Sequence, residues 1–227
     1  MKKCKIFYDG VNIAKYIDEV DGVTTNTSFI AEANITDYNK FIDESLKIVK
    51  EKPISFQITE RTLKGIEKQA RFLSSKGDNV YVKIPILLPD ETSTSDLIHK
   101  LSNEGIKINV TCIHTFSQIE EAINSINKNT PSIISVFCGG ISDSGVYPEE
   151  YIKLAVKLTK NYNADVLWAG CQRVLSIIES NDLNYGIVTV PDGIMRKRNR
   201  IGISVYDTSV KKSNLFFNDG DKLNLKL

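Results

Sequence analysis

Lys83 lies inside the run VYVKIP, residues 80–85, whose other residues suit a buried β-strand. A low-dielectric environment favours the neutral amine over the ammonium ion, and the neutral amine is the form that attacks carbonyl groups. A lysine at this depth is therefore a candidate to form a Schiff base, activated by desolvation rather than by a neighbouring base. The alternative is a lysine near a strand end that extends its ammonium group into solvent.

Polar side chains near the ends of other apolar runs favour the first interpretation. These side chains are Asp9; Thr24, Thr25 and Asn26; Gln57; Asn109 and Thr111; and Ser135. The two-residue period of a strand predicts that Asn109 and Thr111 share one face, as do Ser135 and Phe137. A hydrogen-bonded structural layer would also satisfy these groups. Six strand ends that converge around a lysine nevertheless match the requirements of a catalytic site.

Eight short apolar runs alternate with amphipathic segments along the chain. The runs are KIFYD, GVTT, PISFQI, VYVKI, IKINVTCI, SIISVFC, ADVLWA and YGIVTV. The clearest amphipathic segments are residues 37–50, 60–75, 92–103, 117–128 and 148–160. This order predicts an α/β protein with a single (β/α)8 TIM barrel over residues 1–227 and a C-terminal helix at about 204–217. A doubly wound open sheet is the alternative, but no G-x-G-x-x-G follows a strand, and GGISDSG at 139–145 does not fit that fingerprint.

Composition excludes several classes of partner. The 227 residues are 41% hydrophobic and 25% charged with a net charge of +1, so neither nucleic acid nor a membrane surface is an expected partner. No stretch approaches ~18 consecutive apolar residues. The cysteines contain no C-x-x-C pair, a pattern typical of reduced thiols, and we expect a cytoplasmic protein.

The chain resembles the transaldolase family, in particular its short bacterial members and the related fructose-6-phosphate aldolases. The matching pieces are IFYDG, GVTTN, VYVKIP, GIKINVT, IISVF and SDSGVYP. The resemblance implies a (β/α)8 barrel that moves a three-carbon dihydroxyacetone unit through a lysine Schiff base, without a cofactor. It implies that Lys83 is this lysine and that Asp9 is an acid and base for the sugar hydroxyls. It also implies a polar shell around the three-carbon unit from Asn26, Asn109, Ser135, Thr24 and Thr111, and a water held between Thr111 and Gln57.

Several positions depart from the family pattern. Gln57 matches the aldolase branch, where transaldolases usually carry glutamate, whereas Phe137 matches the transaldolases. A proline that usually follows T-T-N is replaced by Thr27, which could cap the next helix. The positions that bind the substrate phosphate in the family hold Gly140, Gly170 and Gln172. Replacement anion ligands could come from Arg173, Arg196, Lys197, Arg198 and Arg200, although a solvated basic surface also explains the last four.

Other candidate sites are weaker. Cys112, His114, Cys138 and Cys171 follow three strands and form a possible zinc set. Strand alternation would send Cys112 and His114 to the face opposite Thr111, so we expect no metal site. His114 is also a candidate catalytic residue near the rim, and Trp168 is either a packing residue or part of a substrate pocket.

The sequence therefore predicts a transaldolase-like class I enzyme that transfers or cleaves a dihydroxyacetone unit of a sugar or sugar phosphate. The alternatives are an aldolase that acts on an unphosphorylated or modified sugar, and a non-catalytic sugar-binding barrel. The segment SVKKSNLFFNDG at 209–220 could join copies of the chain, and we expect a homo-oligomer.

Overall fold

The computed structural model describes residues 4–183 and 186–225. The chain divides into two compact units, one that ends at Met195 and one that begins at Arg196. The first unit contains every strand of the described residues, and the second is mainly helical.

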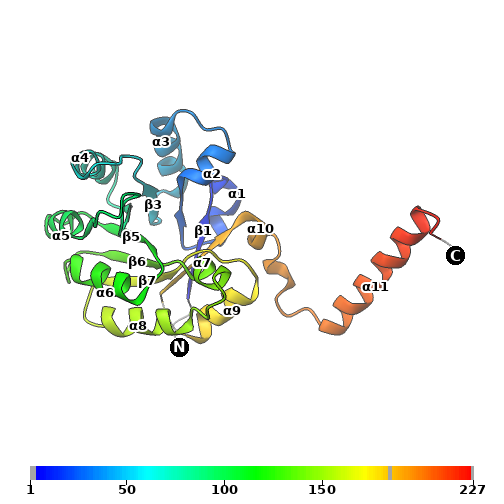
Figure 1. Ribbon diagram of the computed structural model, residues 1–227. Coiled ribbons are helices and arrows are strands. Elements are labelled where there is room, and N and C mark those ends of the chain that lie inside the picture. The colour runs from blue at the N-terminus through cyan, green and yellow to red at the C-terminus, as the bar shows by residue number, and fades with distance from the viewer. Residues whose placement is uncertain (1–3, 184–185, 226–227) are drawn as a thin grey trace. The chain divides into compact units, whose positions relative to one another are not determined.

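Eight parallel strands close into a barrel in which each strand pairs with its neighbours in the sequence (Figure 1). The strands are β1 (Lys5–Asp9), β2 (Gly22–Thr24), β3 (Ile54–Gln57), β4 (Val80–Pro85), β5 (Ile108–Ile113), β6 (Ser132–Val136), β7 (Ala164–Trp168) and β8 (Ile187–Pro191). Because β1 pairs with both β2 and β8, the sheet has no edge and the open-sheet alternative is wrong. The predicted (β/α)8 TIM barrel is confirmed. Tyr185, which begins the last predicted strand, lies outside the described residues.

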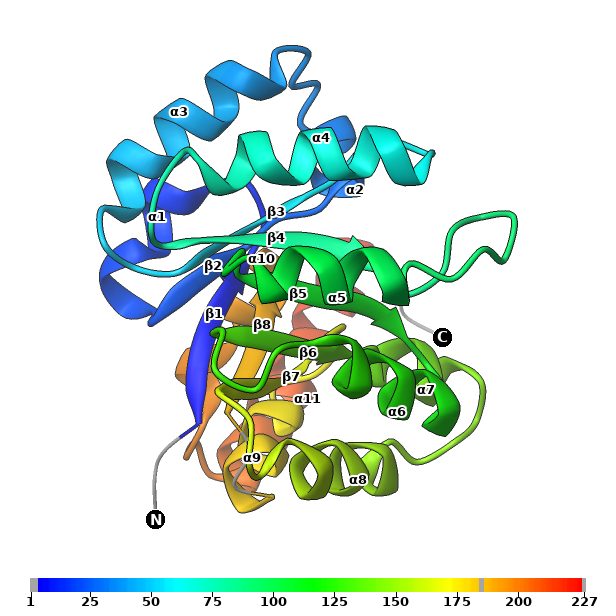
Figure 2. The same ribbon diagram turned by 90° about the vertical axis from the view of Figure 1, so that its left-hand side faces the viewer.

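Helices cover the outside of the barrel (Figure 2). They are α1 (Ile13–Tyr16), α2 (Thr27–Glu32), α3 (Tyr38–Val49), α4 (Leu63–Ser74), α5 (Ser95–Asn103), α6 (Phe116–Ser125), α7 (Cys138–Asp143), α8 (Glu149–Thr159), α9 (Leu175–Asp182) and α10 (Asp192–Met195). The five predicted amphipathic segments become α3, α4, α5, α6 and α8. Side-chain caps fix several of their starts, for example the reciprocal capping box of Thr115 and Gln118 at α6.

The start of α2 differs from the prediction. Asn26, not Thr27, is the N-cap, because the Asn26 side chain accepts a hydrogen bond from the backbone N–H of Phe29 at 3.0 Å. Thr27 is the first residue of the helix. The cap holds the Asn26 amide at the end of β2, where its oxygen is already engaged and its NH₂ group is the remaining donor.

Apolar packing has two parts. The larger cluster joins the strands to the helices around them. A smaller cluster contains Phe7, Ile133, Leu167, Ala169 and Ile187. Phe7 and Ile133 each precede a predicted site residue, Asp9 and Ser135, by two positions, and therefore lie on the same face of their strands. These side chains form an apolar floor under the polar rim.

The second unit contains a short 3-10 helix at Arg198–Arg200 and helix α11 (Val205–Lys222), where the sequence predicted a helix at about 204–217. Ser204 caps α11 by accepting hydrogen bonds from the N–H groups of Tyr206 and Asp207. No helix among the described residues is long and apolar enough to cross a membrane.

Candidate active site

A cavity of about 490 Å³ opens at the carboxyl ends of the barrel strands. Strands β1 to β8 each contribute a residue of the strand itself or of the loop after it. The lining includes seven of the predicted site residues: Asp9, Thr24, Asn26, Gln57, Lys83, Ser135 and Phe137. The other lining residues include Cys112, which the sequence analysis weighed only as a zinc ligand, and Thr189, which it did not consider. Thr189 is the polar residue inside the last apolar run, and that break in hydrophobicity is the signal that could have identified it.

Lys83 is buried, with 6% of its surface exposed, and its amine opens into this cavity. Its Nζ donates a hydrogen bond to the backbone oxygen of Thr25 at 3.3 Å. The strand register places Gln57 and Asn109 beside Lys83, and both carry neutral side chains. None of the ion pairs found among the described residues includes Lys83. The strand neighbours of Lys83 are therefore neutral, and the charged group that interacts with it electrostatically is the carboxyl of Asp9.

Asp9 is the acidic group that lines the cavity together with Lys83. The Thr24 hydroxyl donates to Asp9 Oδ1 at 2.7 Å and also lies within hydrogen-bond distance of the Thr189 hydroxyl. Burial raises the pKa of the Asp9 carboxyl above its usual range, while the positive charge of Lys83 and the hydrogen bond from Thr24 oppose part of that shift. A carboxyl whose pKa is raised in this way is a better proton acceptor than an ordinary aspartate, and it can return the proton later.

Gln57 lies beside the lysine at the end of β3. Its Nε2 donates to the backbone oxygen of Lys83 at 3.3 Å, which fixes the amide at the rim of the cavity. The Tyr38 hydroxyl donates to the backbone oxygen of Gln57 at 2.8 Å and supports the same strand end from α3. The amide can orient a water molecule but cannot take up a proton.

Asn109 and Ser135 are joined below the cavity. The Ser135 hydroxyl donates to Asn109 Oδ1 at 2.6 Å, and Asn109 Nδ2 donates to the Ser55 hydroxyl at 3.0 Å. Asn109 is fully buried and does not line the cavity, whereas Ser135 does. Asn109 therefore holds Ser135 in place, and of these two side chains Ser135 is the one that lines the cavity.

Strand β5 does not keep the alternation that the sequence analysis assumed. Its register against β6 shifts between Val110 and Ile113, and Cys112 has a positive φ of 61°. The expectation that Cys112 faces away from the site is wrong, because the bulge turns this thiol into the cavity with Lys83. Thr111 is fully buried and does not line the cavity, and its hydroxyl has no hydrogen-bond partner among the described residues.

His114 lies beside Phe137, with ring centroids 5.1 Å apart, and its Nδ1 is 3.0 Å from the backbone oxygen of Cys112. A Cβ at Gly140 would lie 2.6 Å from His114 Nε2. The imidazole thus occupies the space into which a side chain at position 140 would extend, so glycine at this position and the His114 ring are sterically linked. His114 itself is not among the residues that line the cavity with Lys83.

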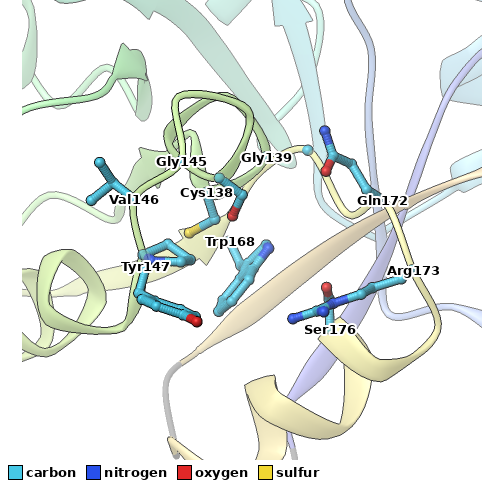
Figure 3. Close-up of a pocket in the computed structure, with 12 residues that line it drawn as sticks. Cys138, Gly139, Gly145, Val146, Tyr147, Trp168, Gln172, Arg173 and Ser176 are labelled. Carbon is cyan, nitrogen blue, oxygen red and sulfur yellow. The ribbon is translucent and has the colours of Figure 1, made fainter.

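A second cavity of about 340 Å³ follows β6 and β7 (Figure 3). Gly170, Gln172 and Arg173 line it, as does Trp168. Arg173 forms an ion pair with Glu179 at 2.8 Å. Arg196 and Arg198 belong to the second unit, and their role as anion ligands stays a prediction.

The cysteines at positions 4, 112, 138 and 171 are all free thiols. The described residues contain no group of three or more His, Cys, Asp or Glu side chains that could hold a metal ion. Burial raises the pKa of Cys171 to about 11, so this thiol stays protonated at neutral pH.

Comparison with known proteins agrees with the geometry. The family model described as Transaldolase/Fructose-6-phosphate aldolase matches residues 6–223. The chain is 29% identical to a "Probable transaldolase" of Caldicellulosiruptor saccharolyticus over 96% of this chain and 98% of that protein. It is 34% identical to a "Probable transaldolase" of Streptococcus pyogenes serotype M5 over 85% of this chain and 89% of that protein.

The barrel also resembles the solved structure of a protein whose sequence has little identity with this chain. A crystal structure of KGPDC from Streptococcus mutans superposes with a TM-score of 0.57 at 11% identity. The match covers 86% of this chain and 91% of that chain. At this identity the likeness supports the barrel fold alone.

Proposed function

Because this chain belongs to the transaldolase and fructose-6-phosphate aldolase family, we propose that it is a class I enzyme whose Schiff base forms on Lys83. Its substrate is a ketose or ketose phosphate, from which it takes a dihydroxyacetone unit. The observation that carries the proposal is the buried amine of Lys83, which opens into the same cavity as the carboxyl of Asp9. An amine nucleophile and a carboxyl proton acceptor are the two groups that this chemistry requires.

The reaction begins at the ketose carbonyl. The Lys83 nitrogen attacks this carbon, and the resulting carbinolamine loses water to give the protonated imine. The proton transfers of this step need a group within reach of the nitrogen. A water held by Gln57, which lines the same cavity, would be that group. Ser135, which lines the cavity and is held by Asn109, would bind a hydroxyl of the three-carbon unit.

Carbon–carbon cleavage follows. The Asp9 carboxylate takes the proton of the hydroxyl on the carbon beyond the bond that breaks, and that carbon leaves as an aldehyde. The electron pair of the broken bond moves into the imine and gives an enamine on Lys83. The enamine then attacks the carbonyl carbon of an acceptor aldehyde, and Asp9 returns its proton to the new hydroxyl. Hydrolysis of the resulting imine releases the product and restores the free lysine.

Cleavage without transfer is the alternative within the same chemistry. Water, instead of an acceptor aldehyde, then releases the ketone by protonation and hydrolysis of the enamine. Gln57 supports this alternative because it matches the aldolase branch, while Phe137 supports transfer. The two outcomes differ in whether free dihydroxyacetone accumulates when donor is supplied without an acceptor. A non-catalytic sugar-binding barrel would produce neither covalent adduct nor ketone.

Borohydride trapping tests the proposal directly. The full chain is incubated with a panel of ketoses and ketose phosphates, reduced with borohydride and measured by intact mass. We expect one adduct per chain, with the mass of the whole donor or of the three-carbon unit left after cleavage, and peptide mapping should place it on Lys83. Lys83→Arg is the control, because arginine remains protonated and cannot form the imine. Absence of any adduct across the panel, or an adduct on a different lysine, would contradict the assignment.

A further inference from the structure

Three of the described residues that line the cavity around Lys83 carry a titratable side chain. They are Asp9, Lys83 itself and Cys112. The proposed reaction uses two of them, because Lys83 is the nucleophile and Asp9 takes the hydroxyl proton when the carbon–carbon bond breaks. The thiol of Cys112 has no role in those steps, although it shares their cavity.

The steps that make and hydrolyse the imine need a group that stores a proton. Gln57 and Phe137 line the cavity, but neither an amide nor a phenyl ring titrates. A water held by Gln57 can pass a proton on without keeping it. A titratable side chain must therefore give the proton that the departing water takes from the cavity, and must take it back during hydrolysis.

The irregularity in β5 brings Cys112 to the place where such a group is needed. The register against β6 shifts between Val110 and Ile113, and Cys112 itself adopts a φ of 61°. Cys112 is the one exposed thiol of the described chain, since the other three cysteines are buried. A thiol that opens into the cavity can exchange its proton with a ligand there, which a packed thiol cannot do.

The surroundings of Cys112 suit a thiol that loses its proton only during the reaction. Burial raises the pKa of the Cys112 thiol above its usual range, while the positive charge of Lys83 and the hydroxyl of Thr111 oppose part of that shift. The resting thiol therefore carries its proton at neutral pH.

Thr111 is a second and independent sign of an anion at this position. Its hydroxyl is fully buried and has no hydrogen-bond partner among the described residues. An unsatisfied buried hydroxyl is costly, and a thiolate on the adjacent Cys112 would accept its hydrogen bond.

We propose that Cys112 is the acid and the base for formation and hydrolysis of the imine on Lys83. This inference rests on the proposed function, and it adds a proton-transfer group to the Schiff-base steps. Its ligand is a ketose, or the three-carbon ketone itself.

The proton and the electrons balance in both directions. In the carbinolamine the nitrogen lone pair forms the C=N bond and the C–O bond breaks, while the oxygen takes the thiol proton and leaves as water. A protonated imine on Lys83 and a thiolate on Cys112 remain as a pair of opposite charges. In hydrolysis a water attacks the imine carbon, the C=N electrons return to nitrogen, and the thiolate takes a proton from that water.

Dihydroxyacetone tests these steps separately from cleavage, because it forms an imine but has no carbon–carbon bond for Asp9 to break. The full chain is mixed with dihydroxyacetone, treated with borohydride after increasing times and measured by intact mass. Cys112→Ser should form the adduct at least ~10²-fold more slowly than wild type, the lower limit of what general acid–base catalysis contributes. The final amount should equal that of wild type, because a proton-transfer group changes the rate and leaves the equilibrium unchanged.

The choice of variants separates proton transfer from structure. Serine keeps the size of the side chain and a hydrogen bond to Thr111, but its hydroxyl does not titrate near neutral pH. Cys112→Ala should be as slow as Cys112→Ser. Cys4→Ser is the matched control and should react at the wild-type rate, because Cys4 is a buried thiol that lines neither cavity.

Alkylation tests whether the thiol faces the bound ketone. Iodoacetamide should label the exposed Cys112 in the untreated protein, as peptide mapping would show. Reduction of dihydroxyacetone onto Lys83 should suppress this labelling, since the adduct fills the cavity beside the sulfur. Lys83→Arg carries no adduct after the same treatment and should be labelled like untreated protein.

Several outcomes would overturn the inference. They are imine formation at the wild-type rate in Cys112→Ser, parallel loss of rate and final amount in that variant, and undiminished labelling of Cys112 in the chain that bears the adduct. Slow imine formation in Asp9→Asn but not in Cys112→Ser would assign the role to Asp9 instead. Failure of the proposed function is distinct, because the wild type would then form no Lys83 adduct with dihydroxyacetone, and the inference would fall with it.

Discussion

The residues beside Lys83 on the two adjacent strands carry neutral side chains. Gln57 and Asn109 flank the lysine in the sheet, and Thr25 accepts the hydrogen bond from its Nζ. A carboxylate in direct contact would favour the ammonium form and oppose nucleophilic attack. The acidic group of the cavity, Asp9, is instead engaged by the hydroxyl of Thr24. This separation suits one group that acts as a nucleophile and another that moves protons.

Lys83→Arg should abolish turnover and preserve the fold. Arginine keeps the positive charge but cannot attack a carbonyl, so we expect less than ~1% of the wild-type kcat/KM. Activity is measured with the donor identified by trapping, and circular dichroism checks the fold. A folded variant that keeps more than this activity would rule out covalent catalysis by Lys83.

Asp9→Asn should form the covalent adduct but cleave it slowly. The amide can hold a substrate hydroxyl, yet it cannot accept the proton that cleavage releases. We expect kcat to fall by ~10²-fold or more, with the trapped adduct close to the wild-type amount. Both quantities are measured on the same samples. Parallel loss of adduct and product would mean that Asp9 serves binding or folding.

The raised pKa of Asp9 sets a pH dependence of activity and of stability. If cleavage needs the ionised carboxylate of Asp9, activity should rise as the pH rises through this raised pKa. The hydrogen bond from Thr24 lowers the pKa of Asp9, so Thr24→Val should raise this pKa further and shift the rise in activity to higher pH.

The effect of Asp9 on stability runs opposite to that of most aspartates, because its pKa is higher in the folded protein than in the unfolded chain. The carboxyl's contribution is fully present below about pH 4 and is lost as pH rises through the folded pKa. Asp9→Asn should therefore gain unfolding free energy relative to wild type as the pH rises above about 4, measured by urea denaturation. No change in the difference between the two proteins across this range would contradict the assigned shift.

At the scale of elements, two local irregularities shape the rim of the barrel. The bulge in β5 turns Cys112 into the cavity with Lys83, and the start of α7 approaches the loop after β7 through Gly139 and Gly170. The contact at Gly139 leaves no room for a side chain, whereas Cys112 adopts a positive φ that residues other than glycine rarely adopt.

Gly139→Ala should destabilise the barrel. Its methyl group would overlap the backbone oxygen of Gly170, and overpacking against backbone costs about 1–3 kcal/mol. Gly193→Ala is the matched control in helix α10, because a Cβ there meets no atom within 4 Å. The free energy of unfolding should fall in the first variant and stay equal or rise in the second. Equal free energies of unfolding for the two variants would show that α7 and the loop after β7 can move apart at this point without a loss of stability.

At the scale of the whole molecule, the second unit is the candidate for assembly. Helix α11 carries Val210, Leu215, Phe216 and Phe217 among charged residues, and a single helix has no core of its own in which to bury them. Association of α11 with a second copy of the chain would supply that burial. That residues 1–227 act as one domain, and that the protein is a homo-oligomer, both stay predictions.

Substitution of Phe216 and Phe217 by serine should lower the oligomeric state. Light scattering after size-exclusion chromatography should give a multiple of 25.4 kDa for the wild type and a smaller species for the variant. The Lys83 adduct serves as a check that the barrel remains folded. A wild-type protein that is monomeric at all concentrations would contradict this prediction.

The sequence by itself determined the barrel and most of the residues around the lysine. Apolar runs that alternate with amphipathic segments leave few arrangements, because strands buried on both faces need helices on the outside. The carboxyl ends of such strands meet at one rim, so Asp9, Thr24, Gln57, Lys83 and Ser135 could be placed together from their positions in the runs alone.

Only the tertiary structure decided which of these polar groups reach the cavity. Asn109 and Thr111 are buried and do not line it, and Cys112 enters it because a shifted register breaks the two-residue period. The short helices α2, α7 and α9 span too few turns to give a helical period in the sequence. The pairing of Arg173 with Glu179, and the backbone contact between the chain segments at Gly139 and Gly170, likewise depend on distances that local sequence patterns do not encode.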